Sequence, residues 1–414
     1  MIDIQLLRQS PDEVAKKAAD KGYTIDANAI LALDDARRQM QGEIDELRSK
    51  RNEISAQMKG GKPAPELIET GKQLKVEIAE KEAAFKQVSD ELKTAMNSVP
   101  NPAFDDAPLG GEEDSVEISR WGDQPTGGID HLDFATKRDW VDFERGAKVA
   151  GAKFYYLKGD LALLENAITQ YALHFLLEKG FTYMTVPNMV NGRTATGTGF
   201  APRSDSQSDE YFIEGEDLSL IATAEMPLTG YHADEIIDEK DLPLFYAGYS
   251  PCYRKEAGTY GKHTRGLFRV HQFNKLEMYA YTTPEQSREV HEKLLAIEEA
   301  LWQSIGIPYH VVNIAAGDLG APAAKKYDIE YWSPVDEKYR ELTSCSNCTD
   351  FQARNLNIRV RRENGKIETV HTLNGTAVSL ARSLVVVIEH YQNEDGTLTI
   401  PEVLRPYMQN RESI

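Results

Sequence analysis

The sequence contains 414 residues, of which 41% are hydrophobic and 27% are charged, and its formal net charge is −19. No stretch is apolar for long enough to predict a membrane span, and the acidic balance argues against nonspecific binding to nucleic acid, which depends on clustered Lys and Arg. The length predicts two domains. Because residues 1–22 lack a long apolar core and a small-residue cleavage site, we expect no secretory signal and a cytoplasmic location.

The three cysteines, Cys252, Cys345 and Cys348, are too few for a disulfide framework and favour a reducing compartment. Cys345 and Cys348 form a C-x-x-C pair, which is typical of half a zinc site or of a redox pair. No second C-x-x-C and no paired H-x-x-x-H supplies the remaining ligands. The sequence therefore does not favour zinc.

Residues 30–95 have the pattern of a helical hairpin. Apolar residues recur with a period of about 3.5, which is typical of a coiled-coil seam. The first run is Ile30, Leu33, Arg37, Met40, Ile44, Leu47, Arg51, Ile54 and Met58, and the second is Leu67, Gly71, Leu74, Ile78, Lys81, Phe85, Val88, Leu92 and Ala95. Between them, residues 59–65 contain two glycines and two prolines, which interrupt a helix. We expect two long antiparallel helices.

This hairpin is nearly neutral in an acidic chain. Residues 30–98 contain 12 Lys or Arg and 13 Asp or Glu, a net charge of −1, so the other residues carry −18. A dimerisation coiled coil or a solvated spacer would explain such an arm. A surface that reaches a distant, negatively charged partner is the other explanation, and the residues alone leave both open.

A linker and a mixed region follow the hairpin. Residues 97–114 are rich in Pro, Gly and acids, which is typical of a linker. Residues 161–179 predict a helix that stops at Gly180, and residues 181–186 predict a strand that ends at Pro187. Further strands are predicted at residues 244–248, 267–281, 309–313, 327–332 and 357–362.

These elements predict an α+β protein with two domains. Residues 1–105 would form the helical arm, a long antiparallel coiled-coil hairpin. Residues 106–414 would form a domain built on a mainly antiparallel sheet flanked by helices. Neither G-x-G-x-x-G nor G-x-x-x-x-G-K-[ST] occurs, so two common nucleotide-binding loops are absent from the sequence.

Residues 254–273, RKEAGTYGKHTRGLFRVHQF, concentrate positive charge and glycine. We predict two antiparallel strands joined by a loop over residues 257–266. Arg254 can offer a planar fork to a phosphate, Glu256 on the same strand face can accept a hydrogen bond, and Phe273 offers an aromatic surface. ATP presents the complementary groups. An ordinary surface hairpin with solvated charges explains the same residues, and these residues alone do not decide between the two.

Four ordered blocks resemble the class II aminoacyl-tRNA synthetases, in their bacterial-type seryl form. The R-x-E at 254–256 and the T-R-G-L-x-R-x-H-Q-F-x-K-x-E at 264–277 resemble motif 2 of that class. The other blocks are T-A-E at 223–225, E-L-T-S-C-S-N-C at 341–348 with D-F-Q-A-R at 350–354, and a motif 3 segment, N-G-T at 374–376 with Ala381-Arg382 through Glu389. The predicted helix, strand and Pro187 resemble motif 1, which builds the dimer interface in this class. With the hairpin, the resemblance spans almost the whole chain.

The resemblance implies a role for each matched residue. Arg254 would hold the α-phosphate of ATP, while Phe273 and Arg382 would sandwich the adenine. The implied catalytic residues are Arg254, Glu256 and Arg382; the implied ATP-binding residues are Arg254, Lys255, Glu256, Phe273, Glu341, Leu342, Thr343, Ser344 and Arg382; and the implied serine-binding residues are Thr223, Ala224, Glu225, Glu277 and Thr376. Glu341 and Ser344 would coordinate Mg²⁺ through hard oxygen atoms. We expect His271 to be structural.

The implied activity is that of a serine–tRNA ligase. L-Serine and ATP would form seryl-adenylate and pyrophosphate, and the seryl group would pass to the 3′ end of tRNA(Ser), with tRNA(Sec) as a further candidate. The arm would lie along the variable arm of the tRNA, in a homodimer with no membrane contact. In the loop, Lys262, His263 and Arg265 would meet polyanions. Two segments depart from the family pattern. Residues 379–383 are less rich in glycine than many motif 3 segments, and residues 199–208 are unusually rich in serine, so the closure of the loop over the serine pocket is where differences are expected.

Two other classes of function would leave different residues in the sequence. A homologue that loads an amino acid onto a carrier protein would keep the catalytic blocks but lack the hairpin. A coiled-coil interaction protein with an inactive synthetase domain would lose Arg254, Glu256, Glu341 or Arg382, and all four are present. Threonyl enzymes of this class use zinc held by one Cys and two His, a set that is not matched here.

Overall fold

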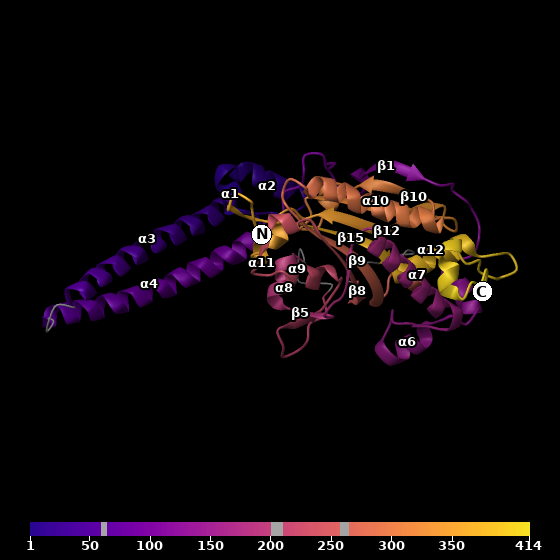
Figure 1. The fold of residues 1–414 in the computed structure, drawn as a ribbon, viewed down its shortest axis with the longest axis horizontal. Coiled ribbons are helices and arrows are strands. Elements are labelled where there is room, and N and C mark those ends of the chain that lie inside the picture. The colour runs from indigo at the N-terminus through magenta and orange to yellow at the C-terminus, as the bar shows by residue number, and fades with distance from the viewer. Residues whose placement is uncertain (59–63, 200–209, 257–264) are drawn as a thin grey trace. The chain divides into compact units, whose positions relative to one another are not determined.

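The computed structural model describes residues 1–58, 64–199, 210–256 and 265–414 and divides the chain into two compact units, Met1–Pro100 and Asn101–Ile414 (Figure 1). Most of the predicted loop at 257–266, with Lys262 and His263, lies outside the described residues, as does most of 199–208. In the described parts of the chain, no helix combines the length and apolar character that crossing a membrane requires.

The first unit consists of helices. Its elements are α1 (Ile4–Gln9), α2 (Pro11–Asp20), α3 (Ala27–Gln57) and α4 (Pro65–Asn97). The Asp26 carboxylate caps the start of α3 by accepting a hydrogen bond from the Ala29 N–H at 2.9 Å. The predicted hairpin is confirmed, since α3 and α4 run side by side in Figure 1.

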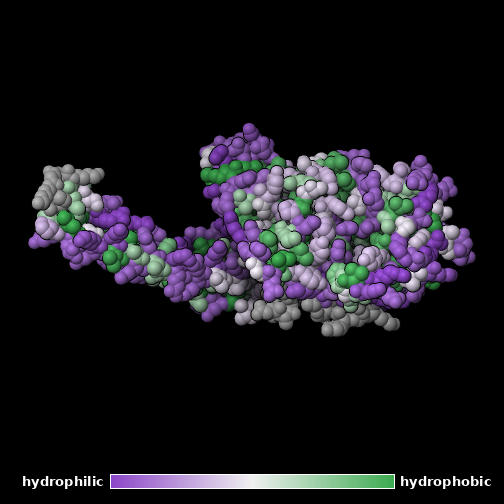
Figure 2. Space-filling view, turned by 90° about the horizontal axis from the view of Figure 1, so that it is seen from below, coloured by the Kyte–Doolittle hydropathy of each residue, from purple (hydrophilic) through white to green (hydrophobic). Residues whose placement is uncertain are grey.

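The predicted seam is the buried face of this helix pair. Leu47, Leu74 and Ile78 form one buried cluster, with Ile54 packed against it. Ion pairs flank the seam, including Arg48 to Glu82 at 2.8 Å. Outside the seam, the visible surface of the pair is mainly hydrophilic (Figure 2). Burial of one apolar stripe therefore holds the two helices together, while α1 and α2 also pack against α3.

The second unit is built on an eight-stranded sheet with the order β1-β10-β11-β12-β15-β9-β8-β4. Its strands are β1 (Val116–Trp121), β4 (Thr182–Thr185), β8 (Leu244–Tyr253), β9 (Gln272–Thr282), β10 (Tyr309–Asn313), β11 (Lys325–Ser333), β12 (Lys338–Asn347) and β15 (His371–Ser379). Neighbouring strands are antiparallel except for β4 and β8. The predicted mainly antiparallel sheet is confirmed.

Smaller sheets and helices surround this sheet. The short strands are β2 (Val141–Asp142), β3 (Tyr156–Leu157), β5 (Met189–Asn191), β6 (Leu218–Leu220), β7 (Ile236–Asp238), β13 (Arg359–Arg361) and β14 (Ile367–Thr369). The helices are α5 (His131–Lys137), α6 (Phe143–Ala150), α7 (Gly159–Glu178), α8 (Gly192–Thr198), α9 (Glu225–Gly230), α10 (Ser287–Ile305), α11 (Phe351–Leu356) and α12 (Leu380–Tyr391). The main core joins α7, α10 and α12 to the large sheet.

Several predicted boundaries are wrong. The predicted strand 267–281 begins only at Gln272, because Gly266–Phe268 forms a short 3-10 turn instead. The predicted strand 357–362 is reduced to β13, since Asn357 has a positive φ of 57° and ends α11. Two strands near the middle of the sheet, β12 and β15, were not predicted at all.

Candidate active site

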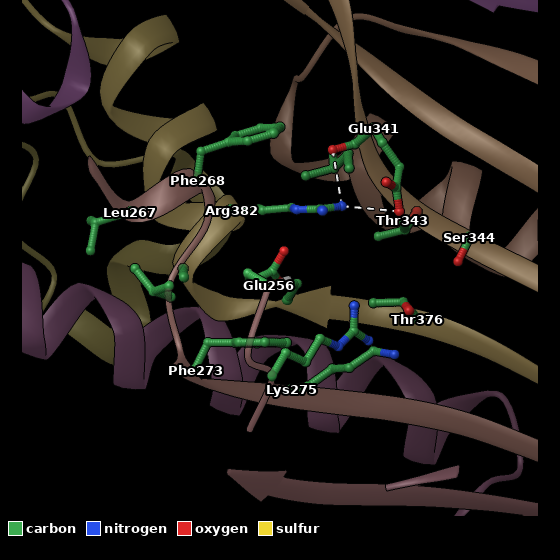
Figure 3. A pocket seen from close by; sticks show the side chains of 15 residues that line it. Glu256, Leu267, Phe268, Phe273, Lys275, Glu341, Thr343, Ser344, Thr376 and Arg382 are labelled. Atoms are coloured by element: carbon green, nitrogen blue, oxygen red, sulfur yellow. Dashed lines mark hydrogen bonds and ion pairs between the residues drawn. The ribbon is translucent and has the colours of Figure 1, made fainter. Parts of the chain in front are cut away.

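One pocket of the second unit gathers most of the predicted ATP-binding residues. It is lined by Arg254, Glu256, Leu267, Phe268, Val270, Phe273, Lys275, Glu341, Leu342, Thr343, Ser344, Thr376, Ser379, Ala381 and Arg382. These side chains come from the ends of β8 and β9, the turn before β9, the strands β12 and β15, and the start of α12, and they converge on one space (Figure 3). Segments more than a hundred residues apart thus build a single polar cavity.

The pocket contains an Arg–Glu pair. Arg382 Nη1 lies 3.0 Å from Glu341 Oε1 and also donates to the Glu341 carbonyl oxygen at 3.3 Å. The positive charge of Arg382, assisted by Lys326, lowers the pKa of Glu341 to about 2. The Glu341 side chain is still 42% exposed. It is therefore an ionised carboxylate with coordination sites left for a cation.

An irregular register brings Ser344 to the same sheet face as Glu341. Residues three apart in a regular strand point to opposite faces. Here Glu341 pairs with Glu330 and Ser344 with Asp328, and the register shifts between Ile329 and Glu330. Since Asp328 and Glu330 are two apart, their partners share a face. The bulge therefore places a carboxylate and a hydroxyl together at the pocket wall.

Aromatic rings and guanidinium groups form the pocket walls. The guanidinium of Arg254 lies 5.4 Å from the ring centroid of Phe273, and that of Arg382 lies 5.1 Å from the ring centroid of Phe268. Figure 3 shows Phe268 and Phe273 on opposite sides of the pocket, with Arg382 reaching between them. Phe268 was missed in the sequence because it occupies a variable position of motif 2. Its place directly after Gly-Leu in that motif was the only available signal.

Glu256 lines the pocket, but not for the predicted reason. The strand β8 ends at Tyr253, and Glu256 has a φ of 51°, so it is not an extended strand residue on the face of Arg254. Its Oε2 accepts a hydrogen bond from Arg269 Nη1 at 2.6 Å. His271 has the expected structural role, since its Nδ1 donates to the Arg254 carbonyl at 2.9 Å. These contacts hold the backbone that carries Arg254 and Glu256.

A buried polar cluster adjoins the pocket through Lys275. The Lys275 ammonium forms an ion pair with Glu277 and donates to Thr223 Oγ1 at 3.3 Å. Glu225 Oε1 accepts hydrogen bonds from Gln352 at 2.7 Å and from Asn374 at 2.9 Å. Lys275 lies in the quoted motif, yet no role was predicted for it.

Burial raises the pKa of two carboxyl groups in this cluster. Burial, and then the neighbouring charge of Glu277, raise the pKa of Glu225 to about 7. Burial also raises the pKa of Glu277, although Lys275 opposes the shift. Two carboxyl groups therefore share one local ammonium. A second cation beside them would favour the ionised forms of both carboxyl groups.

Comparisons with known proteins decide the family. Residues 1–103 match the model of the seryl-tRNA synthetase N-terminal domain, and residues 210–391 match that of the tRNA synthetase class II core domain (G, H, P, S and T). The chain is 46% identical over 417 residues to the serine–tRNA ligase of Dictyoglomus turgidum, covering 99% of this chain and 98% of that protein. It belongs to the seryl-tRNA synthetase family. A serine–tRNA ligase of Methanocella arvoryzae is 43% identical over 425 residues, covering all of both chains.

Solved structures of the seryl-tRNA synthetase family share the fold. The Pyrococcus horikoshii enzyme complexed with ATP superimposes with a TM-score of 0.90 at 40% identity, covering 100% of this chain and 99% of that one. The cytoplasmic serine–tRNA ligase of Naegleria fowleri in complex with AMP gives a TM-score of 0.86 at 32% identity, covering 100% and 98%. Because the relatives are bacterial and archaeal, the bacterial type remains a prediction.

Some residues matched to this family lie outside the pocket. Lys255 lies 5.7 Å and 5.6 Å from the rings of Tyr211 and Phe212 rather than in the pocket lining. The Ala224 side chain is fully buried in an apolar cluster, so only its backbone is available to a ligand. Arg265, expected to meet polyanions, pairs with Asp133 at 2.5 Å.

The two cysteines of the C-x-x-C pair are not joined by a disulfide. Cys345 and Cys348 are free and buried. Within the described ranges, no group of three or more His, Cys, Asp or Glu side chains is arranged to hold a metal ion. Cys348 accepts a weak hydrogen bond from Asn374 Nδ2 at 3.7 Å. Both thiols are therefore shielded from solvent.

Proposed function

We propose that this member of the seryl-tRNA synthetase family is a serine–tRNA ligase that forms seryl-adenylate and then seryl-tRNA(Ser). The observation that carries the proposal is the convergence of Arg254, Glu341 and Arg382 on one pocket, next to the buried polar cluster around Lys275. The chain is also 46% identical to a serine–tRNA ligase. Charging of a tRNA(Ser) transcript with labelled serine tests it. The carrier-protein and inactive-protein alternatives are disfavoured by the arm and by the intact pocket.

In the first step, a serine carboxylate oxygen attacks the α-phosphorus of ATP, the bond to the bridging oxygen breaks, and pyrophosphate leaves. Arg254, whose Nε donates to the Ala222 carbonyl at 3.3 Å, would neutralise charge on the α-phosphate. Glu256 would accept from the adenine amine. Phe273 and Phe268, with Arg382, would enclose the ring. The contribution of the protein is positioning and charge neutralisation, and no general base is required.

The buried cluster would receive serine. Glu225 and Glu277 would hold the α-ammonium, and Thr223 and Thr376 would bond the substrate's polar groups. Thr376 pairs in register with Glu277 across β15 and β9, which supports a joint role. Omission of a bonded hydroxyl leaves buried polar groups unsatisfied, so such a pocket discriminates against alanine.

Glu341 and Ser344 would hold Mg²⁺. The fit rests on an ionised carboxylate and a hydroxyl on one face of β12, both hard oxygen donors, with phosphate oxygens available to complete the shell. Bound there, the cation would neutralise phosphate charge. The chain's own task is to keep Glu341 ionised and oriented, which Arg382 does.

The arm would bind the tRNA, and two chains would form the active dimer. Arg38, with a side chain 59% exposed, and Lys86, 78% exposed, form surface ion pairs with Asp35 and Asp90, and they would exchange these partners for tRNA phosphates. The elements of motif 1 and its surroundings expose apolar residues: Tyr156, Leu163, Leu177 and Tyr183. Such exposure fits an interface between copies. The enzyme would also charge tRNA(Sec), and it would act in the cytoplasm.

A further inference from the structure

A buried histidine outside the substrate pocket supports its aromatic wall. His131 begins α5 and is 1% exposed. Its Nε2 accepts a hydrogen bond from the backbone N–H of Leu267 at 3.2 Å. Leu267 lies in the turn Gly266–Phe268, directly before Phe268, which lines the nucleotide pocket. The imidazole therefore contacts the backbone next to that wall, not the pocket itself.

The contact fixes which nitrogen carries the proton. A backbone N–H can only donate, so Nε2 must be the unprotonated nitrogen and the proton of a neutral ring must lie on Nδ1. Nδ1 makes no hydrogen bond within the described residues, but it lies 3.4 Å from Glu389 Oε1 and 3.8 Å from Asp130 Oδ2, so these carboxyl groups act on it through their charge. A carboxylate at this position favours the Nδ1–H form.

Glu389 is itself held in place. Its side chain is 1% exposed, and its Oε2 accepts hydrogen bonds from Ser333 Oγ at 2.8 Å and from the Tyr331 hydroxyl at 3.3 Å. Glu389 lies on α12, the helix whose first turn carries Arg382. The helix α12 thus contacts Phe268 directly through Arg382. Through Glu389 and His131, it also supports Leu267, the residue before Phe268.

Close packing around the turn matches this arrangement. Gly266 has a φ of 63°, and a Cβ at this position would lie 2.4 Å from His131 Nε2. Only glycine satisfies both conditions. Arg265, one residue earlier, pairs with Asp133 on the same helix α5. The chain is therefore anchored to α5 on both sides of Gly266, through Arg265 and Leu267.

We propose that His131, oriented by Glu389, is a positioning residue for ATP: its hydrogen bond to Leu267 sets the backbone that presents Phe268 to the adenine pocket. The expected change in the KM for ATP rests on the proposed function. Without the His131 acceptor, the turn Gly266–Phe268 is free to move, so ATP binding must order it and becomes weaker. The buried cluster proposed to bind serine is left intact.

Two amide variants separate the hydrogen bond from the space the ring fills. In His131→Gln, the amide oxygen can replace Nε2 as acceptor, whereas in His131→Asn the shorter amide cannot reach Leu267. We expect His131→Asn to raise the KM for ATP about tenfold, the loss of roughly one hydrogen bond, and to leave the KM for serine within about twofold. His131→Gln should return the KM for ATP to within about threefold of the unmodified enzyme.

A matched control removes a different histidine–backbone hydrogen bond, one made from α12. His390 Nε2 donates to the Trp332 carbonyl at 2.8 Å and does not line the pocket. His390→Asn should cost stability and leave the KM for ATP unchanged. If His131→Asn does not fold, Glu389→Gln serves in its place, because its amide can donate to Nδ1 and so favour the wrong tautomer.

Hydrogen exchange gives a readout that needs no activity. The amides of residues 265–270 should exchange faster in His131→Asn than in His131→Gln or His390→Asn. Equal rates of amide hydrogen exchange and an equal KM for ATP in His131→Asn and His131→Gln would overturn the inference. Failure of the unmodified enzyme to support serine-dependent pyrophosphate exchange would instead overturn the proposed function, leaving the exchange of the amides as an independent test.

Discussion

Arg382 Nη1 at the start of α12 lies 3.0 Å from Glu341 Oε1 on β12. The same guanidinium covers the ring of Phe268 at 5.1 Å, so one side chain connects the carboxylate proposed to hold Mg²⁺ with the wall proposed to hold adenine. A charged pair in a pocket costs desolvation and is retained where its geometry serves a ligand. The pair would therefore link the proposed metal site to the proposed adenine site.

Substitution Arg254→Ala should abolish serine-dependent exchange of pyrophosphate into ATP, by about 10³-fold or more, because it removes the fixed positive charge proposed for the α-phosphate. Circular dichroism and the melting temperature should remain close to those of the unmodified protein. Lys255→Ala is the matched control, since Lys255 is adjacent in sequence but outside the pocket lining. A loss of similar size in both variants would contradict a specific role for Arg254.

Substitution Glu341→Gln should raise the Mg²⁺ concentration needed for half-maximal activity by about tenfold or more, because a neutral amide is a weaker ligand for a hard cation. Titration of activity with MgCl₂ at fixed ATP measures this. Ser346→Ala, on the same strand but outside the pocket lining, should leave the requirement unchanged. An unchanged requirement in Glu341→Gln would remove Glu341 from the proposed metal site.

Sequence patterns predicted the parts of the fold that follow local rules. The seam of the arm was predicted from its period, because burial of one stripe decides both helices. The strands β12 and β15 were missed, because KYRELTSCSN and HTLNGTAVS are rich in polar and small residues that line the site. Motif resemblance located Arg254, Glu341 and Arg382. It could not show the bulge beside Glu341 or the left-handed backbone of Glu256, since both arise from tertiary packing.

Serine binding should release a proton from Glu225 below neutral pH. Burial and Glu277 raise its pKa to about 7, so at pH 6 the free protein holds this carboxyl mainly protonated, and an ammonium ligand requires the ionised form. Calorimetric titration with serine at pH 6 in buffers of different ionisation enthalpy counts the protons. Release should fall towards zero at pH 8 and in Glu225→Gln. Absence of release at pH 6 would contradict contact between Glu225 and the ammonium.

The same raised pKa has a consequence for stability. Between pH 4.5 and about 7, the unfolded chain loses a proton from Glu225 that the folded chain keeps, so the free energy of unfolding should fall as pH rises through this window. Denaturant unfolding at pH 5 and pH 7 measures the difference. Glu225→Gln should show a smaller fall, and an equal fall would assign the pH dependence to other groups.

Disruption of the arm should separate the two steps of the reaction. Leu74→Asp places a charge in the buried seam and should destabilise the helix pair by about 3 kcal/mol or more, lowering tRNA charging while leaving pyrophosphate exchange intact. Val76→Asp is the control, because Val76 is 59% exposed on the same helix. Normal charging by a protein with a melted arm would contradict the proposed tRNA contact.

Motif 1 should be the dimer interface. Leu163→Arg introduces a charge on α7 at a side chain that is 50% exposed, and it should shift the protein from dimer to monomer in sedimentation. Leu109→Arg, at a residue 66% exposed outside these elements, should leave the assembly unchanged. A dimer that persists in Leu163→Arg, or an unmodified protein that is monomeric, would contradict the proposed interface.

The buried cluster beside the nucleotide pocket should select serine for activation. Pyrophosphate exchange into ATP, measured for the full chain with serine, threonine, alanine, glycine and cysteine each at the same concentration, tests it most directly. Serine should stimulate exchange at least about a hundredfold more than alanine, because alanine leaves the hydroxyl partners unsatisfied. Exchange that serine does not stimulate, or that another amino acid stimulates equally, would contradict selection of serine by this cluster.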